Sequence, residues 1–394
     1  MTEIAVICAF LPSRNTGMFT VDLSAASFFS TQFPRAEIKY YCLGDIHKIG
    51  YRSEERHISY RPLHLHLDDV RDADLIVYWG DFLHSKQYWE TDLIGWLVRD
   101  GLSGSRNEAL ELIYKSLMLE KAPPEILKKV VVYGGTIITV GASELIDKRY
   151  SACLQRLLTE AGGVFFRDAI SATKASPFRP LENCLGTDCA LLLGLKDFQN
   201  YGLLADPIVT RSKLGVFFGR SKWIAQPLML ARTLAKTMDL QAAWLPWLRS
   251  SPRQLPLARL AGFPATREPP LPNEILDSLL RCSAVVTDTY HLTVNAWNLG
   301  IPTICVGYGG QNIGHTLGDK KKETLYSQYG AAEYYVYRES IQNPASIPRV
   351  AQYAAEVLAS AEKAAAIKAE IRRHAGSSRS RLINTCEIIL CGKS

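Results

Sequence analysis

AVVTDTYHLTVNAWNLGIPTICVG, residues 284–307, indicates the fold of this chain. Two short apolar runs rich in β-branched residues, Ala284–Thr287 and Thr303–Val306, are typical of buried strands, and the segment between them, about Tyr290–Leu299, has helical spacing. A strand, a helix and a second strand of this length form a parallel βαβ unit. We therefore expect a parallel sheet that helices cover on both faces.

The expected helix carries a polar ridge formed by His291, Asn295 and Asn298, and the ridge begins directly after a strand. Open parallel sheets bind ligands at the carboxyl ends of their strands, where helix N-termini offer N–H groups to anions. His291 is therefore a candidate functional residue. A helix capped by Asp288 or Thr289, with His291 bonded to a backbone carbonyl, explains the same residues without a ligand, and the local sequence favours neither interpretation.

The composition is that of an ordinary globular protein, and 394 residues are enough for two domains. The net charge of +6 permits an anionic substrate, but the basic residues form no stripe of the kind that binds nucleic acid. Nine scattered cysteines without a C-x-x-C pair favour reduced, buried thiols. The N-terminus lacks the pattern of a signal peptide, and no apolar run approaches ~18 residues. We expect a cytoplasmic protein that binds no nucleic acid.

The first half of the chain alternates strands, loops and helices, as a doubly wound α/β domain does. The expected strands are Glu3–Ala9, Ala36–Cys42, Ala73–Trp79, Lys129–Tyr133 and Gly163–Phe166. The expected helices include about Val21–Ser30 and Ser143–Glu160. Leu63–Leu67 also alternates, with His64 and His66 on one face. A solvated strand face is favoured there over a metal site, because the spacing matches no established ligand set. The strand ends carry neither a dinucleotide-binding fingerprint nor a P-loop.

The pattern begins again near 196–213, and the second half has its own α/β alternation. Pro246–Pro272, rich in proline and arginine, is expected to be irregular, and Arg349–Arg373 and Ser380–Leu390 to be helices. The predicted domains are an N-terminal one at 1–200 and a C-terminal one at 201–375, with a helix at 376–394 that could pack back on the first domain.

The stretch VVTDTYHLTVNAWNLGIPTICVG resembles the T-D-R-x-H-G…GxP signature of the polysaccharide pyruvyl transferase family. Five other segments are similar to family segments in the same order: ADLIVYWGD (73–81), FFRDAIS (165–171), TDCALLL (187–193), GVFFGRSK (215–222) and DKKKETLYSQYG (319–330). The ordered set spans most of the chain. Each segment is weakly specific alone, and the set is moderately specific.

The resemblance implies an α/β fold with two Rossmann-like domains, whose parallel sheets face a central cleft as in glycosyltransferase-B enzymes. It implies an enzyme of polysaccharide or exopolysaccharide biosynthesis that transfers pyruvate from phosphoenolpyruvate to two hydroxyls of a sugar, forming a cyclic ketal. No metal or other cofactor is expected. The first domain would bind a sugar or lipid-linked glycan acceptor, and the second would bind the donor. With a lipid-linked acceptor, residues 246–272 could contact the inner face of the membrane.

The resemblance also implies residue roles. His291 matches the motif histidine and Arg220 the donor-binding arginine, and both are expected to be catalytic as well as donor-binding. The wider predicted donor site adds Lys222, Thr289, Asn295 and Lys321, and the predicted acceptor site comprises Asn15, Gly17 and Asp81. A planar cation and a helix N-terminus suit the two anionic groups of phosphoenolpyruvate. A histidine suits the proton transfers of ketal formation.

Two residues depart from the family pattern. The motif arginine is Thr289 here, and the glycine after the histidine is Leu292. Loss of a phosphate-pairing cation should weaken donor binding by about 2–5 kcal/mol unless Arg220, Lys222 or one of Lys320–Lys322 replaces it. A metal-independent glycosyltransferase with a nucleotide-sugar donor is therefore the main alternative. A non-catalytic binding protein is the third, because a fold does not settle a function.

Overall fold

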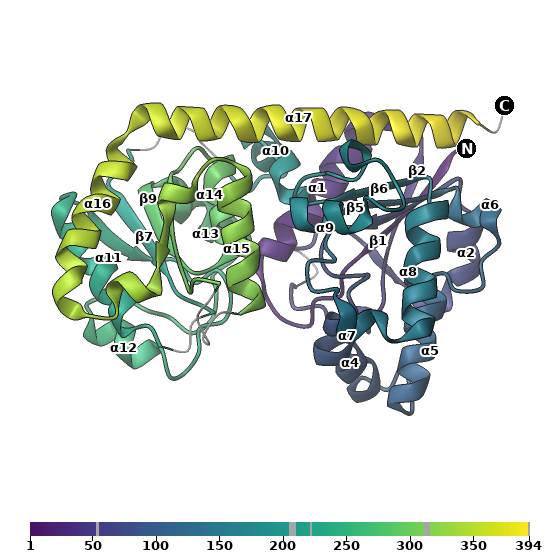
Figure 1. Ribbon diagram of the computed structural model, residues 1–394, viewed down its shortest axis with the longest axis horizontal. Coiled ribbons are helices and arrows are strands. Elements are labelled where there is room, and N and C mark those ends of the chain that lie inside the picture. The colour runs from purple at the N-terminus through teal and green to yellow at the C-terminus, as the bar shows by residue number, and fades with distance from the viewer. Residues whose placement is uncertain (53–54, 205–209, 221–222, 311–315, 393–394) are drawn as a thin grey trace. The chain divides into compact units, whose positions relative to one another are not determined.

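The structure is a computed structural model that describes residues 1–52, 55–204, 210–220, 223–310 and 316–392 (Figure 1). The chain folds into two compact units. Unit 1 comprises Met1–Ser13, Val21–Leu192 and His374–Ser394, and unit 2 comprises Arg14–Thr20 and Leu193–Arg373. Each unit is an α/β fold built on a parallel sheet. The predicted division into an acceptor domain at 1–200, a donor domain at 201–375 and a C-terminal helix at 376–394 stays a prediction.

Unit 1 contains a six-stranded sheet in the order β3-β2-β1-β4-β5-β6, with all neighbouring strands parallel. Its strands are β1 (Glu3–Cys8), β2 (Glu37–Cys42), β3 (Tyr60–Pro62), β4 (Leu75–Trp79), β5 (Val130–Gly135) and β6 (Gly163–Phe166). The strand order reverses between β1 and β4. In open α/β sheets this reversal marks the place where ligands bind, beyond the carboxyl ends of the strands.

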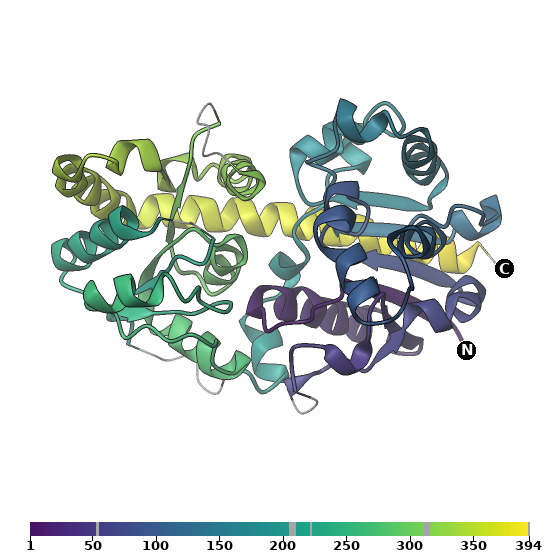
Figure 2. The same ribbon diagram turned by 90° about the horizontal axis from the view of Figure 1, so that it is seen from below.

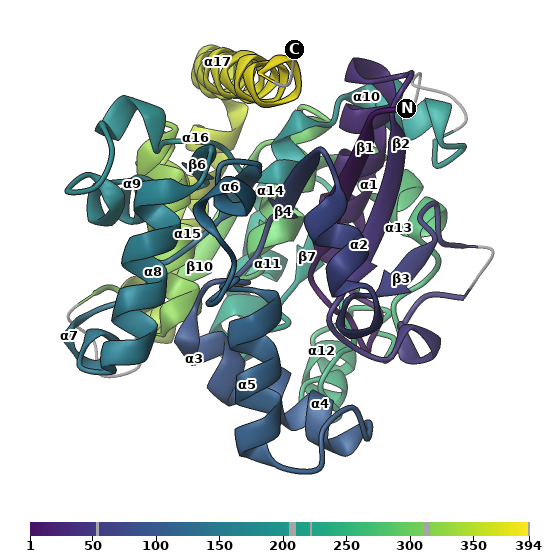
Figure 3. The ribbon, with the colours of Figure 1, turned by 90° about the vertical axis from the view of Figure 1, so that its right-hand side faces the viewer.

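Helices cover both faces of this sheet, because neighbouring residues of a strand point to opposite sides. On one face, Trp79 of β4 donates a 2.9 Å hydrogen bond to the carbonyl of Val21 in α1 (Thr16–Gln32). On the other face, the Tyr78 hydroxyl donates to the carbonyl of Ser116 in α5 (Arg106–Ser116) at 2.7 Å. Beside α5 lies α8 (Lys148–Glu160) (Figure 3). The shorter helices are α2 (Leu67–Asp72), α3 (Lys86–Tyr88), α4 (Ile94–Arg99), α6 (Pro124–Leu127), α7 (Ala142–Leu145) and α9 (Ala169–Ala175).

Unit 2 contains a five-stranded parallel sheet in the order β11-β10-β9-β7-β8. Its strands are β7 (Lys213–Phe217), β8 (Gln241–Trp244), β9 (Cys282–Thr287), β10 (Thr303–Gly307) and β11 (Tyr335–Tyr337). Here the order reverses between β7 and β9. Figure 1 shows α11 (Ala225–Thr237) and α16 (Ile347–Ala359) on one side of β7 and β9. On the other side lie α13 (Pro272–Leu280), α14 (Tyr290–Asn298) and α15 (Leu317–Gln328).

The last helix, α17, runs unbroken over 31 residues, Ala361–Cys391 (Figure 2). The sequence predicts two helices with a break after Arg373, but the break lies at Ser360, between α16 and α17. Gly376 inside α17 costs about 1 kcal/mol relative to alanine. Packing offsets that cost, because Leu382 and Cys386 are completely buried and Tyr133 of β5 bonds Ser378 at 2.9 Å.

Three other local predictions are wrong. Leu63–Leu65 is a 3₁₀ turn and Leu67 begins α2, so the strand ends earlier, at Pro62. The predicted helix Ser143–Glu160 is two helices, because Asp147 accepts bonds from the N–H groups of Arg149 and Tyr150 and so caps α8. The expected irregular excursion Pro246–Pro272 contains a short helix, α12 (Leu255–Leu260). Another short helix, α10 (Leu195–Asn200), opens the long segment of unit 2.

Eight of the nine cysteines are buried free thiols, as predicted, whereas Cys391 is exposed. Among the described residues, no helix combines the length and apolar character needed to cross a bilayer. Within the same part of the chain, no group of three or more His, Cys, Asp or Glu side chains is placed to hold a metal ion.

Candidate functional site

The site in unit 2 is built where its strand order reverses, around the carboxylate of Asp288. This residue follows β9 and is 1% exposed. Its Oδ1 accepts a 2.8 Å bond from the N–H of Gly219 and a 3.2 Å bond from that of Arg220, both of which follow β7. The Thr287 hydroxyl also donates to the Phe217 carbonyl at 2.7 Å. The ends of β7 and β9 are thereby fixed to each other, and the backbone of Arg220 is held in place.

The helix α14 begins directly after this clamp. Its N-cap residue, Thr289, forms no side-chain cap, because its hydroxyl donates to Asp288 at 3.2 Å. The Thr289 side chain therefore does not cap this helix. His291 lies in the first turn of α14, is partly exposed and contacts the Tyr290 ring edge-on, with centroids 5.1 Å apart. The first turn thus presents an imidazole at the edge of the sheet where ligands bind.

The segment Arg14–Thr20 packs against α14 inside unit 2. The amide of Asn295 donates to the Thr20 hydroxyl at 2.9 Å, and the N–H of Thr16 donates to the Trp247 carbonyl at 3.2 Å. Gly17 lies against the imidazole, since a β-carbon at Gly17 would be 2.7 Å from Nδ1 of His291. The segment follows β1 in the chain, but it belongs to unit 2.

This placement corrects the expectation for Asn15 and Gly17, which were predicted to face the acceptor from the first domain. Both belong to unit 2, the unit of His291. The Asn15 side chain is a helix cap, because its Oδ1 accepts from the N–H groups of Gly17 at 3.1 Å and Met18 at 3.4 Å. The cap also explains why α1 begins at Thr16 rather than near Val21 as predicted. Contact with an acceptor stays a prediction for both residues.

The basic side chains near α14 differ in what they can offer an anion. The Arg220 side chain is exposed, and the Lys321 ammonium lies 5.3 Å from the centroid of the Tyr290 ring. Lys322 is buried and bonds the Asp319 carboxylate at 3.0 Å. Burial acts to lower the Lys322 pKa, but Cys305, Asp288 and Asp319 leave it raised. Lys322 is therefore a charged structural residue. Lys222 lies outside the described residues.

In unit 1, two of the segments that resemble the family meet each other. Arg167 forms a buried ion pair with Asp188 at 3.1 Å, and both side chains are at most 2% exposed. Asp168 caps α9 by accepting from the N–H of Ser171 at 2.8 Å. These residues hold the end of β6 in place. Asp81 is different: it follows β4, is partly exposed and has a left-handed backbone with φ of 51°.

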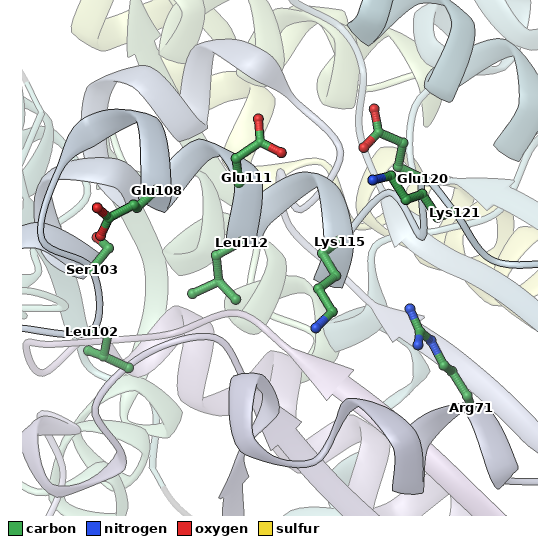
Figure 4. A pocket seen from close by; sticks show the side chains of 9 residues that line it. All are labelled: Arg71, Leu102, Ser103, Glu108, Glu111, Leu112, Lys115, Glu120 and Lys121. Carbon is green, nitrogen blue, oxygen red and sulfur yellow. The ribbon is translucent and has the colours of Figure 1, made fainter.

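Unit 1 also contains a pocket of about 630 Å³, whose lining includes none of the predicted site residues (Figure 4). Arg71, Lys115 and Glu120 are among its lining residues, and Arg71 precedes the start of β4, so the pocket adjoins the amino ends of the strands. The Glu120 carboxylate is already bonded by Arg149 at 2.7 Å. No sequence motif pointed to this pocket, and its lining of mixed charges favours no ligand class.

Residues 23–310 match the model of the family described as polysaccharide pyruvyl transferase. The chain belongs to the polysaccharide pyruvyl transferase family. This family is a family of transferases, so the prediction that the chain is a transferase is confirmed. No curated protein matches the chain.

Solved structures support the predicted architecture of this family member. S. aureus MnaA in a co-structure with UDP is similar with a TM-score of 0.59 and 9% identity, over 99% of this chain and 97% of that one. UDP-GlcNAc 2-epimerase from Neisseria meningitidis, bound to UDP-GlcNAc, gives a TM-score of 0.52 and 12% identity over 98% and 99%. At these identities the likeness concerns the fold alone. Two parallel-sheet α/β domains of the glycosyltransferase-B type are thus confirmed.

In this pyruvyl transferase family member, the structure brings together seven of the predicted site residues in unit 2: Asn15, Gly17, Arg220, Thr289, His291, Asn295 and Lys321. Asp81 lies in unit 1. Sequence reasoning missed Asp288 as the clamp and overlooked Asp22, a 4%-exposed acid on α1. The signal for Asp22 was present, because it is the one ionisable residue in the sequence of α1, between the apolar Val21 and Leu23.

Replacing Gly17 with alanine should disturb the site through His291. The new β-carbon would be 2.3 Å from the β-carbon of His291 and 2.7 Å from its imidazole, so the whole His291 side chain must shift, and overpacking of this kind costs about 1–3 kcal/mol. We expect a lower melting temperature and shifted His291 resonances by NMR. Gly95→Ala is the matched control, because a β-carbon at Gly95 in α4 meets nothing within 4 Å. An unchanged His291 signal in Gly17→Ala would contradict the packing described.

Asp22→Asn should raise the melting temperature at pH 8 more than at pH 5. Burial raises the Asp22 pKa to about 7, against bonds from Tyr60 and Cys8 that lower it, and the Asp81 charge adds to the rise. The folded state therefore binds an extra proton between about pH 4 and pH 7, and Asp22 costs more stability as the pH rises through this window. The expected gain at pH 8 is about 2–5 °C by calorimetry. An equal gain at both pH values would refute the explanation.

Proposed function

We propose that this protein transfers pyruvate from phosphoenolpyruvate to two hydroxyls of a sugar in a polysaccharide or glycan precursor, forming a cyclic ketal and releasing phosphate. The observation that carries the proposal is the clamp of Asp288 on the backbone of Arg220. It fixes a guanidinium-bearing residue at the end of β7, while His291 stands in the first turn of the helix that follows β9.

The residue types suit both charged groups of the donor. An exposed guanidinium can bind a carboxylate or a phosphate with two parallel hydrogen bonds. The N–H groups of the first turn of α14 and the positive end of its dipole favour a second anionic group. Lys321, partly exposed beside the Tyr290 ring, provides a further cation on the neighbouring helix. Because Asp288 is negative and buried, the donor's anions are expected to meet Arg220 and the helix end rather than the clamp.

The reaction needs one group that moves protons. The first hydroxyl adds to C2 of phosphoenolpyruvate as a proton reaches C3, and the methylene becomes a methyl group. The C2–O bond to phosphate then breaks, and a second hydroxyl adds to C2 with loss of its proton. In the proposal, His291 delivers the proton to C3 and accepts one from a hydroxyl, a role that contributes about 10²–10⁴-fold in rate. No step in this scheme requires a cofactor.

A second candidate is a metal-independent glycosyltransferase that uses a nucleotide-sugar donor. Thr289 favours it, because this position lacks the family arginine and its hydroxyl is already bonded to Asp288. Thermal-shift titration separates the two candidates, with phosphoenolpyruvate compared against a panel of nucleotide sugars. We expect phosphoenolpyruvate, and none of the nucleotide sugars, to raise the melting temperature. When a sugar acceptor is added, we also expect phosphate to be released from phosphoenolpyruvate. Stabilisation by a nucleotide sugar, with no response to phosphoenolpyruvate, would favour the second candidate.

For a lipid-linked acceptor, we propose that the 246–272 segment contacts the membrane surface. In α12, Leu260 is 83% exposed and Leu257 39% exposed, and Arg253 precedes them. Exposed apolar side chains next to cations are typical of helices that lie on anionic bilayers. Flotation with anionic liposomes should therefore fall in Leu260→Ser but not in Ile388→Ser, a control at the 72%-exposed Ile388 of α17. Equal flotation of both variants would exclude this contact.

A further inference from the structure

Three aromatic rings of unit 1 form a row that the site in unit 2 does not use. Phe82 follows β4, Tyr88 ends α3, and Trp96 lies in α4. The ring centroids of Phe82 and Tyr88 are 6.4 Å apart, and those of Tyr88 and Trp96 are 6.1 Å apart. The row continues to Phe10, the second residue after β1, whose ring is 5.9 Å from Trp96 and almost fully buried. Phe10 thus anchors one end in the core.

The position of the row distinguishes it from an ordinary aromatic cluster. It starts after β1 and after β4, the two neighbouring strands between which the order of the sheet reverses. Ligands of open α/β sheets bind beyond the carboxyl ends of strands at this point. Tyr88 and Trp96 are also partly exposed, whereas Phe10 is not. The outer part of the row therefore offers ring surface to solvent at the ligand-binding edge of unit 1.

A rare helical feature brings the two exposed rings into edge-to-face contact, with their planes 76° apart. Between α3 and α4, residues Trp89–Leu93 form a single π-helical turn in which the N–H of Ile94 bonds the carbonyl of Trp89. In a regular α-helix, residues eight apart, such as Tyr88 and Trp96, would point about 80° apart. The π turn takes up one extra residue and brings them to within about 20°. Such turns are frequent at functional sites.

Carboxylates border the row and narrow the class of ligand. Burial raises the pKa of the Tyr88 hydroxyl, and the charges of Asp81 and Asp92 add to this rise. Asp81 also directly precedes Phe82, the first ring of the row, in the chain. Negative side chains disfavour an anionic ligand and a bare hydrocarbon chain alike, but they accept hydrogen bonds from hydroxyl groups. A sugar ring combines an apolar C–H face, which packs on aromatic rings, with hydroxyls at its edge. This combination of aromatic surface and a few placed polar groups is typical of small-molecule sites.

We propose that Tyr88 and Trp96, with Asp81 beside them, are a platform on which the acceptor sugar of this transferase stacks. The inference rests on the proposed function, since it concerns the sugar that receives the transferred group. It assigns the aromatic face to the sugar ring and Asp81 to its hydroxyls. Unit 1 thereby contributes to acceptor specificity. Of the three side chains, only Asp81 belongs to one of the sequence motifs, whereas Tyr88 and Trp96 belong to none.

Saturation-transfer NMR on the full chain tests the platform without any donor. The probes are the methyl glycosides of glucose, galactose, mannose and N-acetylglucosamine, with uridine as a competing ring ligand. At least one glycoside should bind saturably, with the largest transfer to its C–H protons. Tyr88→Ala and Trp96→Ala should each raise its Kd at least tenfold. Tyr88→Phe, which keeps the ring, should stay within threefold. Phe178→Ala is the control, because Phe178 is a 37%-exposed aromatic residue of unit 1 outside the row.

The outcomes separate this inference from the proposed function. Absence of saturable glycoside binding, or binding that neither alanine variant weakens, would overturn the platform, and so would uridine binding to the row in place of glycosides. Melting curves of each variant exclude unfolding as the cause of a lost signal. A variant that fails to fold is replaced by Trp96→Leu, which is expected to lose the same binding. Glycoside binding through the row, with no turnover of phosphoenolpyruvate, would instead refute the proposed donor and leave the platform intact.

Discussion

His291→Gln is expected to lower the turnover of phosphoenolpyruvate by about 10²–10⁴-fold, the usual contribution of a positioned acid or base. Glutamine has a similar reach and can hydrogen bond, but it cannot carry a proton between donor and acceptor. His291 is only partly exposed and its backbone lies in the first turn of α14, so the helix should form normally. The loss should appear in kcat more than in KM, because the imidazole acts on the transition state.

Steady-state phosphate release, measured together with the melting temperature, checks this result. His47→Gln is the control, since His47 is exposed in unit 1, outside the proposed site. A His291→Gln enzyme that retains more than about a tenth of the wild-type kcat would remove the histidine from the mechanism. A melting temperature that falls with the activity would point to packing against Gly17 instead, and the Gly17→Ala variant provides the comparison.

Arg220→Ala should raise the KM for phosphoenolpyruvate by a factor of about 30 to 5,000. That range corresponds to the 2–5 kcal/mol expected for truncating one partner of a charge pair in a binding site. The KM of Arg220→Lys should lie between those of Arg220→Ala and the wild type, because lysine keeps the charge but loses the bidentate geometry. Stability should not change, since the backbone N–H, not the side chain, bonds Asp288 and the side chain is exposed.

Kinetics at saturating acceptor, over a range of phosphoenolpyruvate concentrations, measure this effect. Arg232→Ala provides a matched loss of charge, because Arg232 is an exposed arginine of α11 in the same unit. An unchanged KM in Arg220→Ala would assign the donor's anions to other cations, with Lys321 the first to test. Comparing substitutions of Arg220 and Lys321 also shows which cation binds the donor in place of the family's arginine, whose position is occupied by Thr289 here.

The sequence predicted the elements whose signal is local and strong. Ala284–Thr287 and Thr303–Val306 were recognised because buried parallel strands are continuous apolar runs. Leu63–Leu67 was misassigned, because a leucine–histidine alternation fits both a half-buried strand and a 3₁₀ turn that leads into α2. The break at Ser360 was missed for a similar reason: Ala, Glu and Lys favour helix on both sides of it, and tertiary packing places the break.

The candidate site was predictable only in part. His291 and Arg220 lie just after the ends of strands, and the alternation of strands and helices along the sequence locates these ends. The clamp of Asp288 on the loop after β7 joins residues 68 and 69 positions apart, and this pairing depends on which strands are neighbours in the sheet. The same holds for Arg14–Thr20, which the chain places directly after β1 but which Trp247 and Asn295 bind into unit 2. Spacing along the sequence contains neither pairing.

The exchange of segments between the units has a consequence for how the protein is made. Synthesis proceeds from the N-terminus, so most of unit 1 leaves the ribosome first, yet its core includes Leu382 and Cys386 on α17. Until those residues emerge, the face of β5 and β6 that α17 covers is apolar and open to solvent. The unit that begins first is therefore completed last, after unit 2 is already translated. Nascent chains halted near residue 373 should accordingly depend on chaperones that shield exposed apolar sheets.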